Sequence, residues 1–349
     1  MKRVVVGISG GVDSSVTAIL LQKEGYEVVG VTFKFIEDFD ATDAVKVCEK
    51  LNIEHHIIDY TKEFKEIVID KFINDYKTGL TPNPCILCNR KVKFNYLYKA
   101  MKDLNCDYMA TGHYAKVIDG RLYKSVDLNK DQTYFLCEVT KEELSKVLFP
   151  LEGISKEEVR SIALEYNLIN ANKKDSTDVC FITNKFKDYI MDKINNNKGL
   201  VIDVVSNKVI GEHNGLNRYT IGQRKGLGIG GTKDRMFVVG KNVKENILYI
   251  ALGDNNDYLI SDSCIVTSVN WLSDTKIDKC TSKFRYRQEE TEVEIEWLND
   301  TEVLVKYPRG VKSVTPGQAC VFYNGDECLG GGIIKEVRKD NKELWYLNN

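Results

Sequence analysis

The chain lacks any apolar run long enough to span a bilayer, and no charged segment with an apolar signal core opens its 349 residues. These absences predict a soluble, cytoplasmic protein with no membrane partner. An excess of charge of either sign is also missing, since the formal net charge is −2 at pH 7. Any binding of nucleic acid must therefore depend on local basic patches rather than on an overall positive field.

A disulfide framework and a zinc-finger pattern are absent as well. The ten cysteines are scattered, and nothing marks the chain for an oxidising compartment. Cys85 and Cys88 form a Cys-x-x-Cys pair, but the chain has no second such pair and no histidine pair at zinc-finger spacing. Some of the cysteines therefore need another chemical explanation.

Strand-like runs alternate with helix-length segments in the first part of the chain. Strands are predicted at residues 4–8, 28–35, 55–59 and 108–111, and helices at 16–22, 41–51, 63–76, 94–104, 141–148 and 156–166. This alternation predicts an α/β domain with a doubly wound parallel sheet over residues 1–200. We expect a small central domain at 201–262 and a C-terminal all-β barrel at 263–349, where short runs such as 291–297 and 302–307 alternate with turns.

A loop rich in glycine and serine joins the first predicted strand to the first predicted helix. Gly10 and Gly11 allow backbone N–H groups to approach phosphate oxygens at a helix start, where the helix dipole favours anions. The loop has neither the lysine of a mononucleotide P-loop nor the dinucleotide fingerprint. It predicts a nucleotide as first substrate, with Asp13 near Mg²⁺; a simple turn before a buried helix, with Asp13 as a helix-start charge, is the alternative.

Cysteines in two polar segments are candidates for reactive thiols. Pro82 and Pro84 end one helix before the next begins, so Cys85 and Cys88 should lie near a helix N-terminus, with Arg90, Lys91 and Lys93 close by. Such surroundings predict a lowered thiol pKa. Cys180 lies in a second polar segment and is expected to be exposed; packing as a small apolar residue is the alternative.

With these motifs in place, the chain resembles the tRNA-specific 2-thiouridylases, which replace the C2 oxygen of the wobble uridine by sulfur. The resemblance runs along nearly the whole chain in seven ordered blocks, at residues 9–15, 81–94, 110–114, 130–135, 175–182, 219–228 and 315–319. It implies a pyrophosphatase-type ATP loop, which adenylates the uridine oxygen with the help of Mg²⁺. It also implies two partners, a tRNA with a wobble uridine and a sulfur donor such as a cysteine desulfurase or a sulfur-relay protein.

The resemblance assigns roles to individual residues. Cys88 would be the catalytic nucleophile and Cys180 the carrier of persulfide sulfur, with a disulfide between them as one redox state. The other implied contacts are, for ATP, Gly7, Ile8, Ser9, Gly10, Gly11, Val12, Asp13, Ser14, Phe33 and Gly112; for the target base, Asn83, Pro84 and Cys85; and for tRNA, His113, Lys130, Asp131, Gln132, Tyr286, Arg287 and Gln318.

One departure from the family pattern leaves the sulfur chemistry open. Cys85 stands where related sequences commonly have Asp, so Cys85, Cys88 and Cys180 could instead hold a 4Fe-4S cluster whose fourth iron binds sulfide. Two functions of other classes also stay open: an ATP-dependent synthetase that activates a carboxylate, and a non-enzymatic RNA-binding or sulfur-carrier module. The basic and aromatic run at 283–287 is expected to contact RNA, or else to be a solvated strand face.

Overall fold

The computed structural model describes residues 1–174, 179–182, 193–194, 197–228 and 235–347. The N-terminal part is built on a parallel sheet in the order β3-β2-β1-β4-β7 (Glu54–Asp59, Glu27–Lys34, Arg3–Gly7, Tyr108–Ala110 and Val147–Leu148). The chain builds outward from β1 to β3 and then crosses to β4. The strand order therefore reverses between β1 and β4, and in such folds ligands bind at the carboxyl edge of that point.

Helices cover both faces of this sheet. Val4 and Val6 of β1 share a buried cluster with residues of α1 (Val12–Lys23) and α2 (Thr42–Leu51). Val5 points to the other face and packs in the cluster that contains residues of α6 (Phe94–Asp103). Helix α9 (Lys156–Glu165) packs against α1. The predicted doubly wound α/β architecture is confirmed.

One predicted helix contains a π-helical turn, a second such turn precedes the helix predicted at 94–104, and one prediction is partly wrong. The helix expected at 63–76 is built from α3 (Thr61–Phe64), the π segment η1 (Lys65–Ile69) and α4 (Asp70–Lys77). The next consists of α5 (Pro84–Cys88), the π segment η2 (Asn89–Lys93) and α6. The helix expected at 141–148 ends early, as α8 (Lys141–Leu144), because Val147 and Leu148 pair with β4 as strand β7. A short helix, α7 (Thr133–Leu136), precedes it.

The central part is a small sheet in the order β10-β11-β8-β9 (Met236–Asn242, Ile247–Leu252, Gly199–Asp203 and Lys208–His213). It is followed by 3-10 turns and strands that form a closed barrel, because β12 (Ile260–Trp271) pairs with both β15 (Val303–Lys312) and β17 (Glu327–Lys339). The remaining barrel strands are β13 (Lys279–Lys283), β14 (Thr291–Trp297) and β16 (Ala319–Asn324). The short β18 (Lys342–Glu343) pairs with β17. The expected C-terminal all-β barrel is therefore present.

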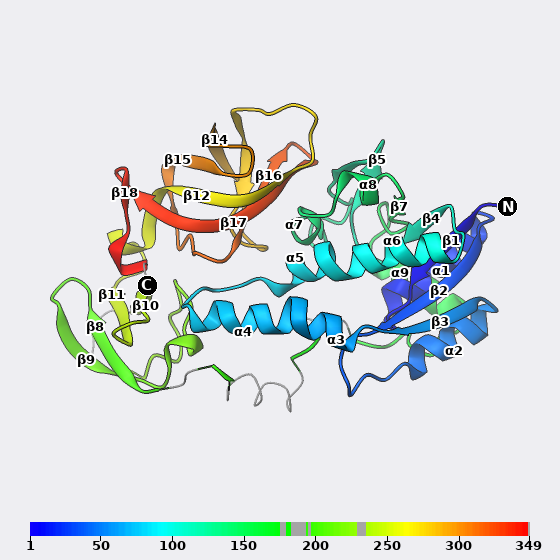
Figure 1. Cartoon of the computed structure of the whole chain (residues 1–349), viewed down its shortest axis with the longest axis horizontal. Helices are drawn as coiled ribbons and strands as arrows, with labels where there is room; N and C mark the ends of the chain where they lie inside the picture. Colours follow the sequence, from blue (N-terminus) through cyan, green and yellow to red (C-terminus); the bar gives the residue numbers. More distant parts are fainter. Residues whose placement is uncertain (175–178, 183–192, 195–196, 229–234, 348–349) are drawn as a thin grey trace.

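A hairpin from the N-terminal part extends the barrel sheet. Strand β6 (Arg121–Tyr123) pairs with β5 (Lys116–Ile118) on one side and with the start of β17 on the other. The hydroxyl of Tyr134 donates to the carbonyl of Ala319 at 3.0 Å. In Figure 1 the parallel sheet and the β8–β9 pair lie at opposite ends of the long axis, with α4 and α5–α6 between them. No helix in the described part of the chain is long and apolar enough to cross a membrane.

Candidate active site

The glycine-rich loop lies at the carboxyl edge of the sheet, between β1 and α1. Gly10 has φ +74°, and a Cβ there would lie 3.1 Å from Asp43 Cβ and 3.2 Å from Ala44 N at the start of α2. Glycine satisfies both demands, because it tolerates the left-handed backbone and has no side chain. Gly11 caps α1 with extended backbone geometry. The predicted order of strand, loop and helix is confirmed, but the helix begins at Val12 rather than at Val16.

Buried hydroxyl groups hold this loop in shape. Ser14 Oγ accepts from the Ser9 N–H at 3.1 Å and donates to the Gly11 carbonyl at 3.1 Å. Ser15 Oγ also donates to the Gly11 carbonyl, at 2.9 Å. Asn170 donates to Ser15 Oγ and to the Gly10 carbonyl. The Gly10 and Gly11 carbonyls are thus bonded within the fold. The amide end of α1 provides the N–H donors and the dipole suited to a phosphate.

Two of the residues expected at ATP, Gly112 and Phe33, flank the loop. A Cβ on Gly112 would lie 2.8 Å from both Asp13 C and Ser14 N, so the segment after β4 lies directly against the first turn of α1. Phe33, at the end of β2, is half-buried with its ring centroid 5.6 Å from that of Tyr60. The carboxyl ends of β2, β1 and β4 thus bring Phe33, the loop and Gly112 to one edge.

Asp13 has two partners that sequence reasoning missed. Its Oδ1 accepts a bond from Lys156 Nζ at 2.6 Å and from the Tyr114 hydroxyl at 3.0 Å. Lys156 is only 7% exposed and starts α9. The capping box formed by Ser155 and Glu158 could have indicated a helix start there, but no sequence signal shows that the lysine points inward. Asp13 fits the expected Mg²⁺ environment, because Mg²⁺ in proteins commonly takes one or two carboxylates together with substrate phosphates.

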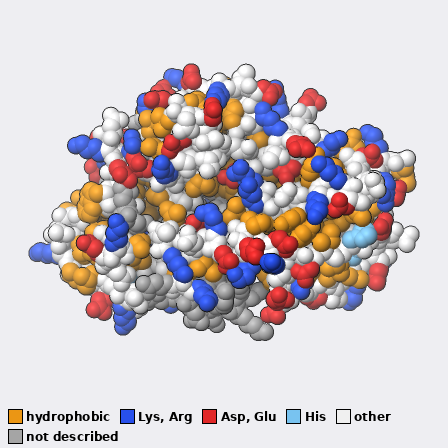
Figure 2. All heavy atoms as spheres, in the orientation of Figure 1, with side chains coloured by type: hydrophobic (Ala, Val, Ile, Leu, Met, Phe, Trp, Pro, Cys, Tyr) orange, Lys and Arg blue, Asp and Glu red, His pale blue; other side chains and the backbone are white. Residues whose placement is uncertain are grey.

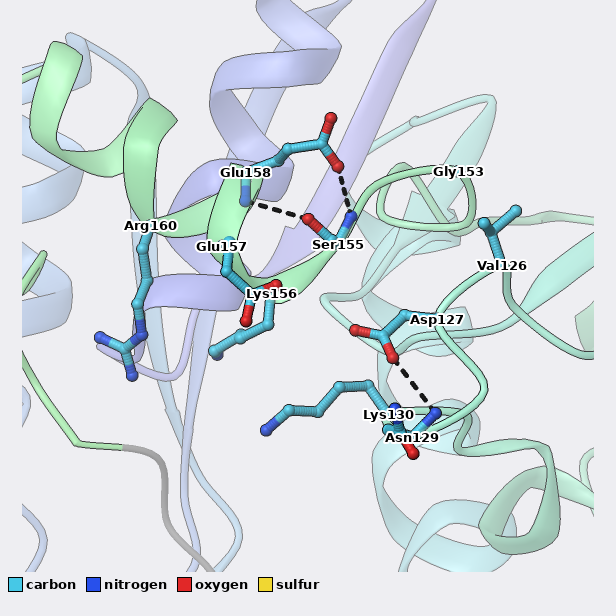
Figure 3. Close-up of a pocket in the computed structure, with 10 residues that line it drawn as sticks. All are labelled: Val126, Asp127, Asn129, Lys130, Gly153, Ser155, Lys156, Glu157, Glu158 and Arg160. Atoms are coloured by element: carbon cyan, nitrogen blue, oxygen red, sulfur yellow. Dashed lines mark hydrogen bonds between the residues drawn. The ribbon is translucent and has the colours of Figure 1, made fainter.

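A mixed-charge cavity of about 630 Å³ opens beside this pair. Figure 3 shows Lys130 reaching from the 126–130 loop toward the N-terminal half of α9, where Lys156 and Arg160 lie. Acidic side chains also line the cavity, namely Asp127, Glu157 and Glu158. Lys130, expected at tRNA, and Lys156, bonded to the loop aspartate, therefore face one space.

The two distant cysteines are held on a shared apolar cluster. Cys88 is 5% exposed and belongs to a cluster that also contains Phe64 and Phe181. Phe181 is 3% exposed, and its ring lies 5.5 Å from those of Phe64 and Phe72. Cys180, the neighbour of Phe181, is exposed as expected. Residues 175–178 of this motif lie outside the described residues.

The expected lowering of the pKa of the Cys-x-x-Cys thiols is wrong. Cys85 lies in the first turn of α5, where Asn83 Oδ1 accepts from its N–H at 3.2 Å, and Cys88 is the last residue of α5. Burial nevertheless raises the pKa of Cys88 to about 12 and also raises that of Cys85, and the nearby Lys93 charge offsets only part of this effect. Of the other two cations, Arg90 pairs with Glu138 at 3.1 Å and Lys91 is exposed. Desolvation of the thiolate therefore outweighs the helix start.

All ten cysteines are free thiols in this structure. Among the described residues, no three or more His, Cys, Asp or Glu side chains are grouped so that they could hold a metal ion. As arranged here, Cys85, Cys88 and Cys180 do not form the ligand set that a 4Fe-4S cluster needs.

Three of the residues expected at tRNA have side chains that are buried or hydrogen-bonded within the protein. Asp131 is 5% exposed and accepts from Thr133 Oγ1 at 2.7 Å and the Ser125 N–H at 3.2 Å. Gln132 Oε1 accepts from the Tyr114 N–H at 2.9 Å. Burial and the Lys93 charge lower the pKa of His113 to about 3, so its ring is neutral near pH 7.

In the barrel, the basic and aromatic run has mostly structural contacts. Phe284 is 1% exposed in the barrel core, and Arg285 donates to the carbonyls of Ile221 and Ser313 at 2.8 and 2.9 Å. The ring of Tyr286 lies 4.3 Å from that of Phe135. Arg287 is exposed. A solvated strand face is therefore wrong for Phe284 and Arg285, and Arg287 is the accessible cation next to them.

Comparison with known proteins places this arrangement in a family. The chain matches three domain families: tRNA methyl transferase HUP domain at residues 2–184, tRNA methyl transferase PRC-barrel domain at 187–252, and Aminomethyltransferase beta-barrel domain at 261–334. A solved 4-thiouridine synthetase–RNA complex with bound ATP is 17% identical, with 55% of this chain and 50% of that chain covered and a TM-score of 0.36. That likeness is too distant to bear on the reaction.

Curated relatives are far closer. The chain is 45% identical over 363 residues to the tRNA-specific 2-thiouridylase MnmA of Bacillus cytotoxicus, covering 99% of this chain and 98% of that protein. It is 45% identical over 370 residues to the protein of the same name in Mycoplasmopsis synoviae, covering 99% of each. With this identity over nearly its full length, the chain belongs to the family of tRNA-specific 2-thiouridylases.

Proposed function

We propose that this protein is an ATP-dependent enzyme that replaces the C2 oxygen of a tRNA wobble uridine by sulfur. The observation that carries the proposal is the joining of two features in one fold. A phosphate-binding loop lies at the carboxyl edge of the sheet, and Phe181 docks the Cys180 segment on the cluster that holds Cys88. The full-length relatives named tRNA-specific 2-thiouridylase support it. Because the substrate is tRNA, we also propose a cytoplasmic enzyme.

The first step activates a poor leaving group. The uridine C2 oxygen attacks the α-phosphorus of ATP, the bond to the β-phosphate oxygen breaks, pyrophosphate leaves, and the N3 proton is lost. The amide end of α1 stabilises the departing pyrophosphate, with Gly11 at the helix cap. Mg²⁺ bound near Asp13 would supply further charge neutralisation. Lys156, bonded to Asp13, adds a buried positive charge at the same loop.

The second step transfers sulfur, and the two cysteines differ in the way that this step requires. Exposed Cys180 is accessible to a donor such as a cysteine desulfurase or a sulfur-relay protein, whereas Cys88 is 5% exposed. We propose that the terminal sulfur of a Cys180 persulfide attacks C2 and expels AMP. Cys88 then attacks Cys180 Sγ and forms a disulfide, which an external dithiol reduces; the 2-thiouridine leaves as an anion and takes up a proton from water at N3.

A close variant of this step reverses the order of attack. Cys88 first attacks Cys180 Sγ, frees hydrosulfide and forms the disulfide, and hydrosulfide then attacks the adenylated C2. Both variants consume one persulfide and one dithiol per tRNA. No step is assigned to an iron–sulfur cluster, because the three cysteines are not grouped as metal ligands in the described structure.

Binding of tRNA must rely on particular cations. Figure 2 shows Lys and Arg side chains mixed with Asp and Glu over the visible face, which fits the net charge of −2. We propose that Lys130 at the mixed-charge cavity and exposed Arg287 contact phosphates, and that Asn83 to Cys85 at the start of α5 face the target base.

The test is tRNA-dependent release of pyrophosphate, followed by nucleoside analysis for 2-thiouridine. Gly11→Val suits this test because Gly11 has φ −88° and a Cβ would meet only Ser9 Oγ, at 3.3 Å, so the fold should persist while phosphate access is blocked. We expect loss of pyrophosphate release with unchanged tRNA binding. Normal release by the variant would refute the nucleotide site. Release without tRNA, driven by a carboxylic acid, would favour a synthetase.

A further inference from the structure

The segment before α5 is fastened to one turn of the barrel. The Thr81 N–H donates to the Pro316 carbonyl at 3.2 Å, and Gln318 Nε2 donates to the Thr81 carbonyl at 2.5 Å. Both polar backbone groups of Thr81 are therefore bonded to a barrel turn that lies more than two hundred residues later in the chain. In Figure 1 the connection from α4 to α5 runs from the central-domain end of the molecule toward the parallel sheet.

The barrel turn at 315–318 allows the segment at Leu80 and Thr81 to approach closely, and hydrogen bonds hold the turn to β17. Gly317 has φ +89°, and a Cβ there would lie 2.9 Å from Leu80 Cβ and 3.0 Å from Thr81 N, so only glycine fits. The Gly317 N–H donates to the Ile334 carbonyl at 2.8 Å, and the Ile334 N–H donates to the Gln318 carbonyl at 2.8 Å. The turn at 315–318 therefore moves with β17.

The segment from Thr81 to Cys88 has little conformational freedom. Pro82 and Pro84, the latter the first residue of α5, fix two φ angles between Thr81 and Cys85. Asn83 caps α5 by accepting from the Cys85 N–H, and Cys88 is the last residue of that helix. A displacement of Thr81 is thus passed on to the cap and to the thiol.

We propose that Gln318 is a positioning residue: its bond to Thr81, together with the Thr81–Pro316 bond, lets the barrel set the position of the segment 83–88. This inference rests on the proposed function and differs from a direct contact of the Gln318 amide with tRNA. Binding of the barrel to RNA and the position of the segment 83–88 are thus coupled through the turn at 315–318. A misplacement of reacting groups by about 1 Å is enough to cost one to two orders of magnitude in rate.

The test replaces Gln318 by Met, which keeps the length of the side chain and removes the donor. We expect tRNA affinity within about two-fold of wild type, kcat for thiolation lower by about 10-fold at saturating tRNA and ATP, and faster amide exchange in residues 81–93. The matched control is Gln22→Met, because Gln22 Nε2 also donates to a backbone carbonyl, that of Leu51 at 3.1 Å, far from the barrel. That variant should change none of the three readouts.

A direct tRNA contact predicts the opposite pattern, with a raised KM for tRNA, unchanged kcat and unchanged exchange at 81–93, and this result would overturn the proposal. A fall in kcat without faster exchange would overturn it too. Gln318→Asn, which keeps the amide one methylene shorter, is the second variant and should show a smaller form of the same change. Amide exchange needs no turnover, so faster exchange in an enzyme that fails to thiolate any tRNA would support the coupling while refuting the proposed function.

Discussion

Lys156 Nζ lies 2.6 Å from Asp13 Oδ1, although the two residues are 143 positions apart in the chain. The contact joins the first turn of α9 to the first turn of α1, and the Tyr114 hydroxyl bonds to the same carboxylate oxygen. It places an ammonium group beside the glycine-rich loop without a lysine inside the loop, and this group balances the charge of Asp13. Three distant segments therefore meet at one carboxylate.

Lys156→Met should therefore impair both folding and nucleotide use. The substitution leaves Asp13, whose side chain is 33% exposed, without its ammonium partner. We expect a loss of about 1–3 kcal/mol in the free energy of unfolding and a raised KM for ATP in pyrophosphate release. Asp13→Asn keeps an oxygen acceptor but leaves the buried Lys156 ammonium without a counter-charge, so it should cost at least as much stability. Urea unfolding and initial-rate assays measure the two effects, and wild-type behaviour of Lys156→Met would contradict them.

Alkylation should distinguish the two cysteines to which we assign catalytic roles. Cys180 is exposed, so iodoacetamide should modify it first. Cys88 should react slowly at pH 8 and about tenfold faster with each pH unit, because only the thiolate reacts and burial raises the pKa of Cys88 to about 12. Lys93→Met should slow Cys88 further by removing a charge that favours the thiolate. Peptide mass spectrometry of each site over a pH series gives the rates, and equal rates at pH 8 would refute the assignment.

Replacement of Cys85 separates the two sulfur mechanisms. In the persulfide cycle Cys88 and Cys180 suffice, so Cys85→Ser should retain most of the thiolation that depends on a cysteine desulfurase. Cys88→Ser and Cys180→Ser should each abolish it. Anaerobically purified wild type should then contain no stoichiometric iron or acid-labile sulfide. Equal loss of activity in all three variants, together with stoichiometric iron in the wild type, would replace the persulfide cycle by a 4Fe-4S cluster.

Two neighbouring arginines should behave differently in tRNA binding. Arg287→Ala should lower tRNA affinity and reduce the slope of log K against log salt by about 0.7–0.9, as expected for one lost phosphate contact. Arg285→Ala should leave that slope unchanged and lower the free energy of unfolding by about 1–3 kcal/mol, because Arg285 bonds the barrel to the Ile221 carbonyl. Filter binding over a salt series and urea unfolding measure both variants. An altered salt slope in Arg285→Ala would mean that it contacts RNA.

Lys241 predicts a pH-dependent stability. It is 4% exposed, its Nζ has no hydrogen-bond partner in the described part of the chain, and burial lowers its pKa from 10.5 to about 8. The unfolded chain therefore binds more protons between these values, and stability rises with pH from about 8 to 10.5. Lys241→Met should gain about 3 kcal/mol at pH 7 and almost nothing at pH 10.5. A gain independent of pH would contradict this origin.

The regular parts of the fold could be predicted because local pattern and final packing agree. The run Val4 to Val6 predicts a buried strand, and the structure confirms it. Successive side chains of this strand point to opposite faces of the sheet, where they pack against different helices. The prediction failed at Val147 and Leu148, whose apolar character continues a helical pattern. Their strand state depends on the edge of β4, which is distant in sequence. The domain limits near residues 200 and 262 stay predictions.

The candidate site was predictable in composition but not in electrostatics. Motif spacing identified Gly10, Cys88 and Cys180, since each belongs to a short local pattern. The pKa of Cys88 was predicted in the wrong direction because its burial comes from Phe64 and Phe181, which belong to other segments. Lys156 escaped notice for a similar reason, since its inward direction is set by how α9 packs on α1.

The pairing of β6 with β17 has a consequence for synthesis on the ribosome. Leu122 and Tyr123 of β6 pair with Cys328 and Glu327, so one edge of this hairpin has no partner until nearly the whole chain has emerged. At typical elongation speeds of about 5–20 residues per second, that edge stays unpaired for tens of seconds. Because β6 is only three residues long, the waiting edge presents few free backbone groups to other nascent chains. Its brevity therefore protects the growing chain from edge-to-edge aggregation before the barrel closes.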